Sequence, residues 1–160
     1  MDPARIPPAA WIAGGLVGVV VVALLGASYA TMRKRADAEM CAVNLRTIYT
    51  TMRSGEHPNS PKWGEMGTGR AFLSNSPRWP THETRDLDFT CPVKGPSREI
   101  DYRGPARPLP QMRPDEPILA DRAGNHGPGK GGNVVLKTGQ IHSCAEGDEV
   151  WAAASRSTSD

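Results

Sequence analysis

Residues 9–30 read Ala-Ala-Trp-Ile-Ala-Gly-Gly-Leu-Val-Gly-Val-Val-Val-Val-Ala-Leu-Leu-Gly-Ala-Ser-Tyr-Ala and contain no charged side chain. At about 1.5 Å per residue, a helix of this length crosses the roughly 30 Å of a bilayer's hydrocarbon core. Trp11 and Tyr29 lie near its two ends, where amphipathic aromatic rings favour the headgroup level. The run therefore predicts one transmembrane helix, preceded by a short amino-terminal segment of residues 1–8.

A cleaved secretory signal is the alternative interpretation of this run. Arg5 and the triplet Ser28-Tyr29-Ala30 supply a basic start and a cleavage site after Ala30. The length of the run and the helical pattern that continues beyond it favour a retained anchor. Gly14 and Gly18 form a small-xxx-small pair, which predicts a close approach of a second helix.

Residues 31–54 continue the helical pattern without Pro or Gly, until Gly55 provides a stop. Apolar residues recur at spacings of three to five, with Leu45 on the same broad face: Met32, Ala36, Met40, Val43, Ile48 and Met52. Both segments together predict one rod of about 45 residues, roughly 70 Å long. Its outer half is expected to present one apolar stripe to a small domain.

The remaining chain predicts a loop-rich small β domain over residues 55–152 and a disordered tail over 153–160. The chain has 160 residues with 17 Gly and 15 Pro, so there is room for one small domain with many turns. One helical turn is expected at 69–74, and strands at 99–102, 117–120, 133–137, 140–143 and 149–152. Thr138-Gly139 predicts a hairpin turn. The fold class is α+β, a long helix packed on a small antiparallel sheet.

Several of these residues together resemble a known family. The long helix runs into Cys41-Ala-Val-Asn-Leu, a Cys91-Pro pair follows, and Leu119 to Asp121 precedes a His, a Gly-rich spacer and Asn-Val. This is similar to pilin-like proteins related to the major pseudopilin of type II secretion, in the planctomycete-type branch. The residues that match the family signature are Asn44, Leu45, Pro92, His126, Gly132, Asn133 and Gly139.

The chain departs from this family at two places. The family's processed start carries a Glu a few residues into the helix, whereas residues 7–11 here are Pro-Pro-Ala-Ala-Trp and the run holds no acid. The family's hairpin Asp and His are Thr138 and Gln140. The resemblance therefore implies a permanently anchored structural or interaction protein of a bacterial membrane, with a role as a minor component of a secretion or pilus-like assembly. Its expected partners are membrane lipid and other pilin-like subunits.

The orientation of the domain is left open by two opposing signals. Arg33, Lys34 and Arg35 follow the run, and the positive-inside rule favours a cytoplasmic carboxy-terminal domain with an unknown partner. The resemblance instead implies a periplasmic or extracellular domain on the inner membrane.

The resemblance also implies a disulfide between Cys41 and Cys91. Closing a loop of about 50 residues would stabilise the domain by roughly 4 kcal/mol in the chain-entropy model. Cys144 is then left without a partner. Three free thiols in a cytoplasmic domain are the alternative.

Two groups of residues in the sequence have side chains that could bind a metal ion. Asp115, Glu116 and Asp121 are candidate calcium ligands, since the family's carboxy-terminal loops bind calcium, and an extracytoplasmic calcium or ligand-binding module is an alternative function. Solvated loop acids are the competing interpretation. His126, His142 and Cys144 are zinc-ligand types without zinc-site spacing, so no zinc site is predicted.

Catalysis and nucleic-acid binding are not predicted. The glycines from Gly127 to Gly132 precede a strand, and no Ser or Thr follows Lys130, unlike a phosphate-binding loop. No Ser lies in a nucleophile-elbow context. The net charge is +2 and the basic residues are scattered, which does not favour a nucleic-acid partner. The sequence therefore predicts no enzyme, no cofactor and no nucleic-acid partner.

Overall fold

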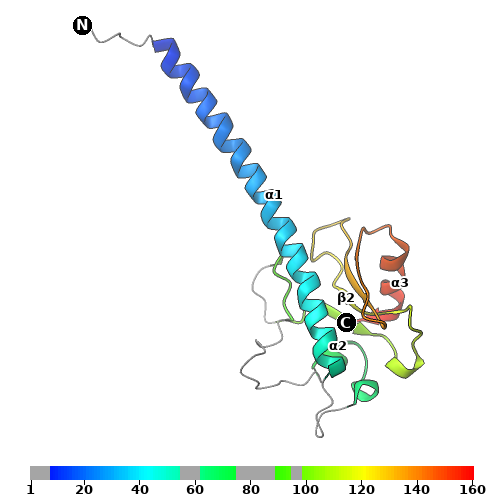
Figure 1. Ribbon diagram of the computed structural model, residues 1–160. Helices are drawn as coiled ribbons and strands as arrows, with labels where there is room; N and C mark the ends of the chain where they lie inside the picture. The colour runs from blue at the N-terminus through cyan, green and yellow to red at the C-terminus, as the bar shows by residue number, and fades with distance from the viewer. Residues whose placement is uncertain (1–7, 55–61, 75–88, 95–98) are drawn as a thin grey trace, which may run out of the picture. The chain divides into compact units, whose positions relative to one another are not determined.

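The computed structural model describes residues 8–54, 62–74, 89–94 and 99–160, with side chains in the first helix from Gly15 onward (Figure 1). The chain divides into two compact units, Met1–Ala36 and Asp37–Asp160. The described elements are, in order, α1 (Pro8–Ser54), η1 (Trp63–Glu65), α2 (Gly69–Ser74), β1 (Tyr102–Pro105), η2 (Leu109–Gln111), β2 (Pro117–Asp121), β3 (Gly132–Leu136), β4 (Ile141–Cys144), α3 (Glu149–Ser157) and β5 (Thr158–Ser159). These elements form an α+β fold, which confirms the predicted fold class.

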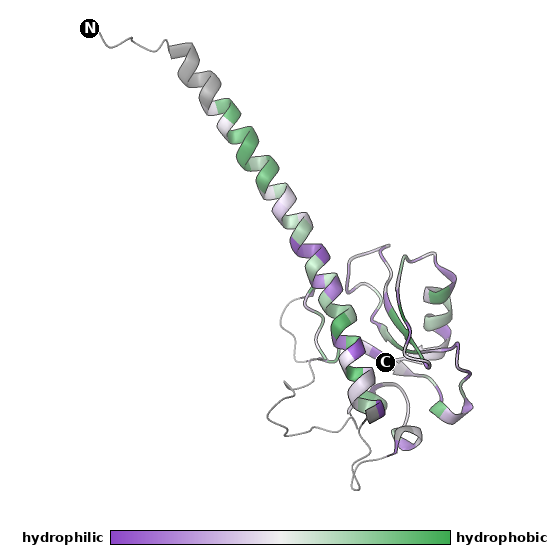
Figure 2. Ribbon diagram, in the orientation of Figure 1, coloured by the Kyte–Doolittle hydropathy of each residue, from purple (hydrophilic) through white to green (hydrophobic). Residues whose placement is uncertain are grey.

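Helix α1 contains both helical segments that the sequence predicts and ends at Ser54, directly before Gly55. Pro8 is its first residue, where a missing N–H costs no helical hydrogen bond. Figure 2 shows the apolar run in the amino-terminal part of α1 and the polar residues that follow it. Among the described residues, α1 is the one helix that is both long enough and apolar enough to cross a membrane.

The carboxy-terminal part of α1 buries one face in the second unit. Cys41, Leu45, Ile48, Tyr49 and Met52 are all buried. Their spacing of four, three, one and three follows the 3.6-residue helical period closely. The predicted stripe is therefore confirmed for Leu45, Ile48 and Met52, and it also includes Cys41 and Tyr49.

Four other residues of the predicted stripe lie outside the buried face. Met32, Met40 and Val43 are 70%, 50% and 54% exposed, and Ala36 is exposed as well. The helix turns by about 100° per residue, so Val43 lies about 140° around the axis from Ile48, and Met40 about 80°. Accepting any spacing from three to five let the predicted stripe drift around the helix.

Five strands form one antiparallel sheet in the order β4-β3-β2-β1-β5. The predicted hairpin is confirmed as β3 and β4, in register Val134 with His142. Gly139 lies in the turn with φ +90, a conformation that favours glycine. The predicted strand at 117–120 is confirmed as β2, and the strand expected at 99–102 begins at Tyr102.

Both faces of the central strands are buried. Neighbouring residues of a strand point to opposite sides of the sheet, so they pack into two separate cores. Val135 and Leu119 pack with Leu45, Ile48 and other residues in the core that includes α1. Val134 and Ala120 pack with Trp151 and Ala154 of α3. The central strands are thus apolar on both sides.

The last strand expected at 149–152 is wrong, because these residues begin helix α3. Val150 and Trp151 suggested a strand, but three consecutive alanines follow and favour a helix. The disordered tail expected at 153–160 is also wrong. Helix α3 continues to Ser157, and β5 pairs with β1, which buries Thr158.

Candidate functional site

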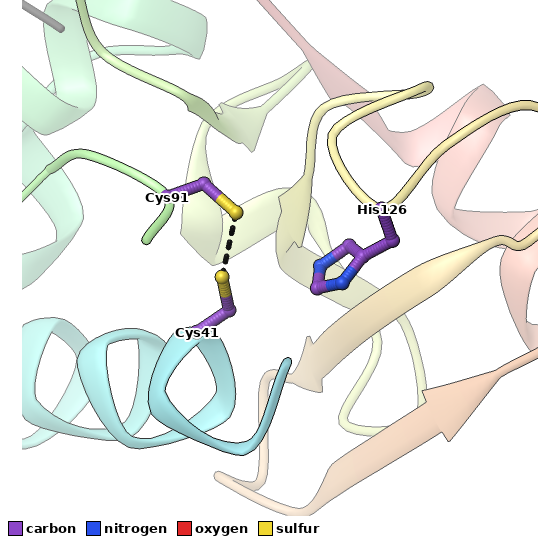
Figure 3. Close-up of side chains that lie close together, drawn as sticks. All are labelled: Cys41, Cys91 and His126. Atoms are coloured by element: carbon purple, nitrogen blue, oxygen red, sulfur yellow. Dashed lines mark hydrogen bonds between the residues drawn. The ribbon is translucent and has the colours of Figure 1, made fainter. Parts of the chain in front are cut away.

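Three chemically reactive side chains from distant parts of the second unit lie together (Figure 3). Cys41 comes from α1, Cys91 from the loop before β1, and His126 from the loop after β2. Figure 3 shows both thiols and the imidazole ring directed toward a common point. One ligand atom from each of the three residues lies within 4.8 Å of the others. We call these residues the thiol–imidazole cluster.

The two sulfur atoms of the cluster lie 2.7 Å apart, and both cysteines are fully buried as free thiols. A disulfide bond is about 2.05 Å long, so the expected pair is adjacent in space but not bonded in this structure. The backbone N–H of Cys91 donates to Asp101 Oδ2 at 3.1 Å. Buried Asp101 therefore holds the loop that carries Cys91.

Asp121 lies behind the imidazole, and its carboxylate is fully buried. Its Oδ2 lies 2.7 Å from His126 Nε2 and accepts from the backbone N–H of Asn133 at 2.7 Å and from Asn133 Nδ2 at 2.9 Å. Its Oδ1 is buried and has no hydrogen-bond partner among the described residues. The carboxylate thus fixes the imidazole with one oxygen and leaves the other unsatisfied.

The charges in the cluster depend on these contacts. The hydrogen bond with the Cys41 thiol lowers the pKa of Cys91, and a hydrogen bond with His126 acts in the same direction. The hydrogen bond with Asp121 raises the pKa of His126 to about 10. The pKa of Cys41 is raised, mainly by its hydrogen bond to Cys91 and then by burial. These contacts favour a charged Cys91 and a charged His126 over a charged Cys41.

Several of the residues on which the family resemblance rests lie next to this cluster. Asn44 donates to the backbone carbonyl of Thr90 at 3.4 Å, next to Cys91, and Pro92 follows Cys91 directly. Asn133 binds Asp121 and also donates to the carbonyl of Ala38 on α1 at 3.2 Å.

At two glycines among these residues, any larger side chain would clash with a neighbour. A Cβ on Gly132 would lie 2.8 Å from the Cβ of Asp121. A Cβ on Gly139 would lie 2.6 Å from a ring atom of Tyr49. Leu45 is a core residue. Most of the signature is thus structural support for α1, the hairpin and the thiol–imidazole cluster.

The calcium candidates do not form one group in the structure. Glu116 pairs with Arg107 and accepts from the backbone N–H of Arg113. Asp115 has a side chain that is 71% exposed. Asp121 is buried against His126. These three acids therefore have separate environments.

The zinc-type residues considered from the sequence are also separated. Cys144 is buried on the α3 side of the sheet with Trp151. His142 lies on β4, and its backbone carbonyl accepts from the Cys144 thiol at 3.8 Å. His126 instead joins Cys41 and Cys91. Sequence reasoning missed this grouping, and it missed that Asp121 is the partner of His126, five residues away.

The predicted approach of a second helix at Gly14 and Gly18 concerns the surface of α1. A Cβ added to Gly18 would meet no atom within 4 Å, so its surface is open in the single chain. Gly14 is in α1, but its surroundings lie outside the described residues.

Comparison of the chain with protein-family models, curated proteins and solved structures found no match. The general architecture, a long apolar amino-terminal helix whose continuation packs on a small antiparallel sheet, is nevertheless pilin-like.

Proposed function

We propose that this protein is a membrane-anchored structural or interaction protein of the pilin-like type, and that it is not an enzyme. The observation that carries the proposal is the contrast within α1. One part of this helix exposes apolar side chains, and the other buries a stripe in the core of an α+β unit.

The apolar part of α1 needs a cover that the chain itself does not provide. Between Leu16 and Met32, ten large apolar or aromatic residues are 47–70% exposed: Leu16, Val17, Val19, Val20, Val21, Val22, Leu24, Leu25, Tyr29 and Met32. Burying one such side chain fully is worth about 1.5–3 kcal/mol. An apolar surface that surrounds a helix on all sides is typical of a membrane span. Membrane lipid is therefore the proposed first partner.

The finer part of the proposal is a minor role in a secretion or pilus-like assembly. The signature residues around the thiol–imidazole cluster and the pilin-like architecture support it. The absence of a Glu from the apolar run argues against assembly as a major filament subunit. Lateral contacts would use the open surface at Gly18 and the exposed Met32, Met40 and Val43.

The proposed orientation places the second unit outside the cytoplasm, at the inner membrane of a bacterium. There, oxidation of Cys41 and Cys91 would join α1 covalently to the loop before β1. The two sulfur atoms are already in contact at 2.7 Å. A cytoplasm-facing domain is the second candidate, because three consecutive basic residues, Arg33, Lys34 and Arg35, follow the apolar run.

Membrane fractionation with a topology reporter tests the proposal. We expect the chain to remain in the pellet after alkaline extraction, and alkaline phosphatase fused after Asp160 to be active. Recovery in the soluble fraction would contradict the anchor. An inactive phosphatase fusion with an active cytoplasmic reporter at the same position would reverse the orientation and leave the anchor intact.

A further inference from the structure

We propose that the thiol form of the cluster is a zinc site, in which Cys41 Sγ, Cys91 Sγ and one ring nitrogen of His126 bind a single Zn²⁺. The inference needs the second unit to be folded, but it does not depend on the membrane anchor or its orientation. It concerns the free thiols that the structure contains.

The donor atoms are of the type and number that zinc takes in proteins. Two Cys thiolates and one His nitrogen form a known three-ligand zinc set, which leaves a fourth position for water or another ligand. Ligands about 2.0–2.3 Å from one tetrahedral ion lie about 3.3–3.8 Å from each other. The three donor atoms here already lie within 4.8 Å of one another. The sulfur atoms must separate by about 1 Å for both of them to bind the ion.

The carboxylate behind the imidazole is a second, independent observation. Histidines that bind metals are commonly held in place by a carboxylate that accepts a hydrogen bond. Asp121 has this position beside His126, and Asn133 in turn holds Asp121 with two hydrogen bonds. Oxygen Oδ1 of Asp121 is buried and unpartnered among the described residues, and a buried carboxylate oxygen requires a cation or a hydrogen-bond donor. A metal ion with a bound water would supply both.

The surroundings would let the ion crosslink separate parts of the second unit. Both cysteines are fully buried, and the His126 side chain is 10% exposed. The ligands come from a helix and two loops, and the two cysteines are 50 residues apart in sequence. One ion would therefore tie α1 to both loops. Because the same sulfur atoms would form the disulfide, zinc and the disulfide exclude each other in any one molecule.

Zinc content and affinity of the full-length protein in detergent test the inference. The protein is purified with a phosphine reductant and without chelators, and metal is measured by plasma mass spectrometry. The stripped, reduced protein is then titrated with Zn²⁺ against a chromogenic chelator. We expect one zinc per chain, and at least a 100-fold loss of affinity in Cys41→Ser and Cys91→Ser. His126→Gln should lose at least 10-fold.

Cys144→Ser is the matched control, since this cysteine is also buried but lies on the α3 side of the sheet. This variant should bind Zn²⁺ as tightly as the chain without substitutions. Circular dichroism of each metal-free variant checks its folding. Co²⁺ substitution of the unmodified chain gives a readout that needs no variant, since a thiolate–cobalt charge-transfer band appears only if sulfur binds the metal.

Two results would overturn the inference. One is a fully reduced, folded protein that binds no zinc at micromolar concentration. The other is zinc binding that persists in the Cys41→Ser/Cys91→Ser double variant. A Cys41–Cys91 disulfide in protein isolated without reductant, followed by no zinc uptake after reduction, is an instance of the first. Neither result affects the membrane fractionation that tests the proposed function.

Discussion

The two parts of α1 have the same secondary structure but opposite relations to their surroundings. Between Leu16 and Leu25 the large side chains are exposed all around the helix. Between Cys41 and Met52 the buried residues lie on one face, and the opposite face carries exposed residues such as Arg46 and Thr50. The distribution of apolar residues around the axis, and not helix propensity, therefore separates a candidate membrane span from a helix that packs on a domain.

The largest expected effect comes from placing charge in the first part. Val20→Arg with Leu24→Arg should cost about 5–7 kcal/mol of insertion free energy, since one Arg at the centre of a span costs about 2.5–3.5 kcal/mol. We expect the double variant to leave the membrane pellet during alkaline extraction. Met40→Arg with Val43→Arg, at exposed positions of the second part, is the control and should stay in the pellet. Equal retention of both would contradict the anchor.

Shortening a buried side chain in the second part of α1 should destabilise the second unit and leave membrane insertion unaffected. Ile48→Ala removes a fully buried side chain and should lower the free energy of unfolding by about 2–5 kcal/mol. Val43→Ala, five residues earlier on the exposed face, should change it by about 0.5 kcal/mol or less. Denaturant titration of the full chain in detergent, followed by Trp fluorescence, measures both. Similar losses would show that the buried stripe is assigned to the wrong face.

The hairpin turn supports the second part of α1 directly. Gly139→Ala should cost about 1–3 kcal/mol, because φ is +90 and the new Cβ would meet the ring of Tyr49. Gly147→Ala is the control, since an added Cβ there meets nothing within 4 Å. The same titration compares the two variants. If both lose equally little, the turn does not press against α1.

A fall in pH should act on the second unit and not on the apolar run, because residues 9–30 contain no Asp, Glu, His, Lys or Arg. The backbone N–H of Arg113, with Arg107, lowers the pKa of Glu116 below its ordinary value of 4.5. A carboxyl with a lowered folded-state pKa stabilises the fold above its unfolded-state pKa. This stabilisation, about 0.5–1 kcal/mol, should be lost as pH falls below about 4.5. Glu116→Gln should reduce the acid sensitivity, and an unchanged profile would contradict the assignment.

Local patterns made much of the fold predictable. The apolar run, the absence of Pro and Gly from 31–54, and Thr138-Gly139 each identify an element within a few residues. The secondary structure of Glu149–Ser157 could not be assigned from local sequence, because a short apolar run suits a strand or a helix. The helix packs against Ala120 and Val134, which belong to other parts of the sequence.

The candidate site was predictable only in part. The resemblance implied that Cys41 and Cys91 are neighbours, and the structure places their sulfur atoms in contact. The addition of His126 depends on how the loop after β2 folds back, and no local sequence pattern specifies that path. Asp121 appeared as a loop acid, whereas its burial follows from its place at the end of β2.

The contacts between α1 and the hairpin have a consequence for the order of folding. Tyr49 donates to the carbonyl of Lys137 across 88 residues of sequence, and Asn133 reaches Ala38 across 95. The residues that cover the buried stripe are therefore synthesised long after the stripe itself. Closing a loop of that length costs roughly 4 kcal/mol of chain entropy, and folding dominated by such distant pairs is slow. During this interval Leu45, Ile48 and Met52 form an uncovered apolar surface on the nascent chain.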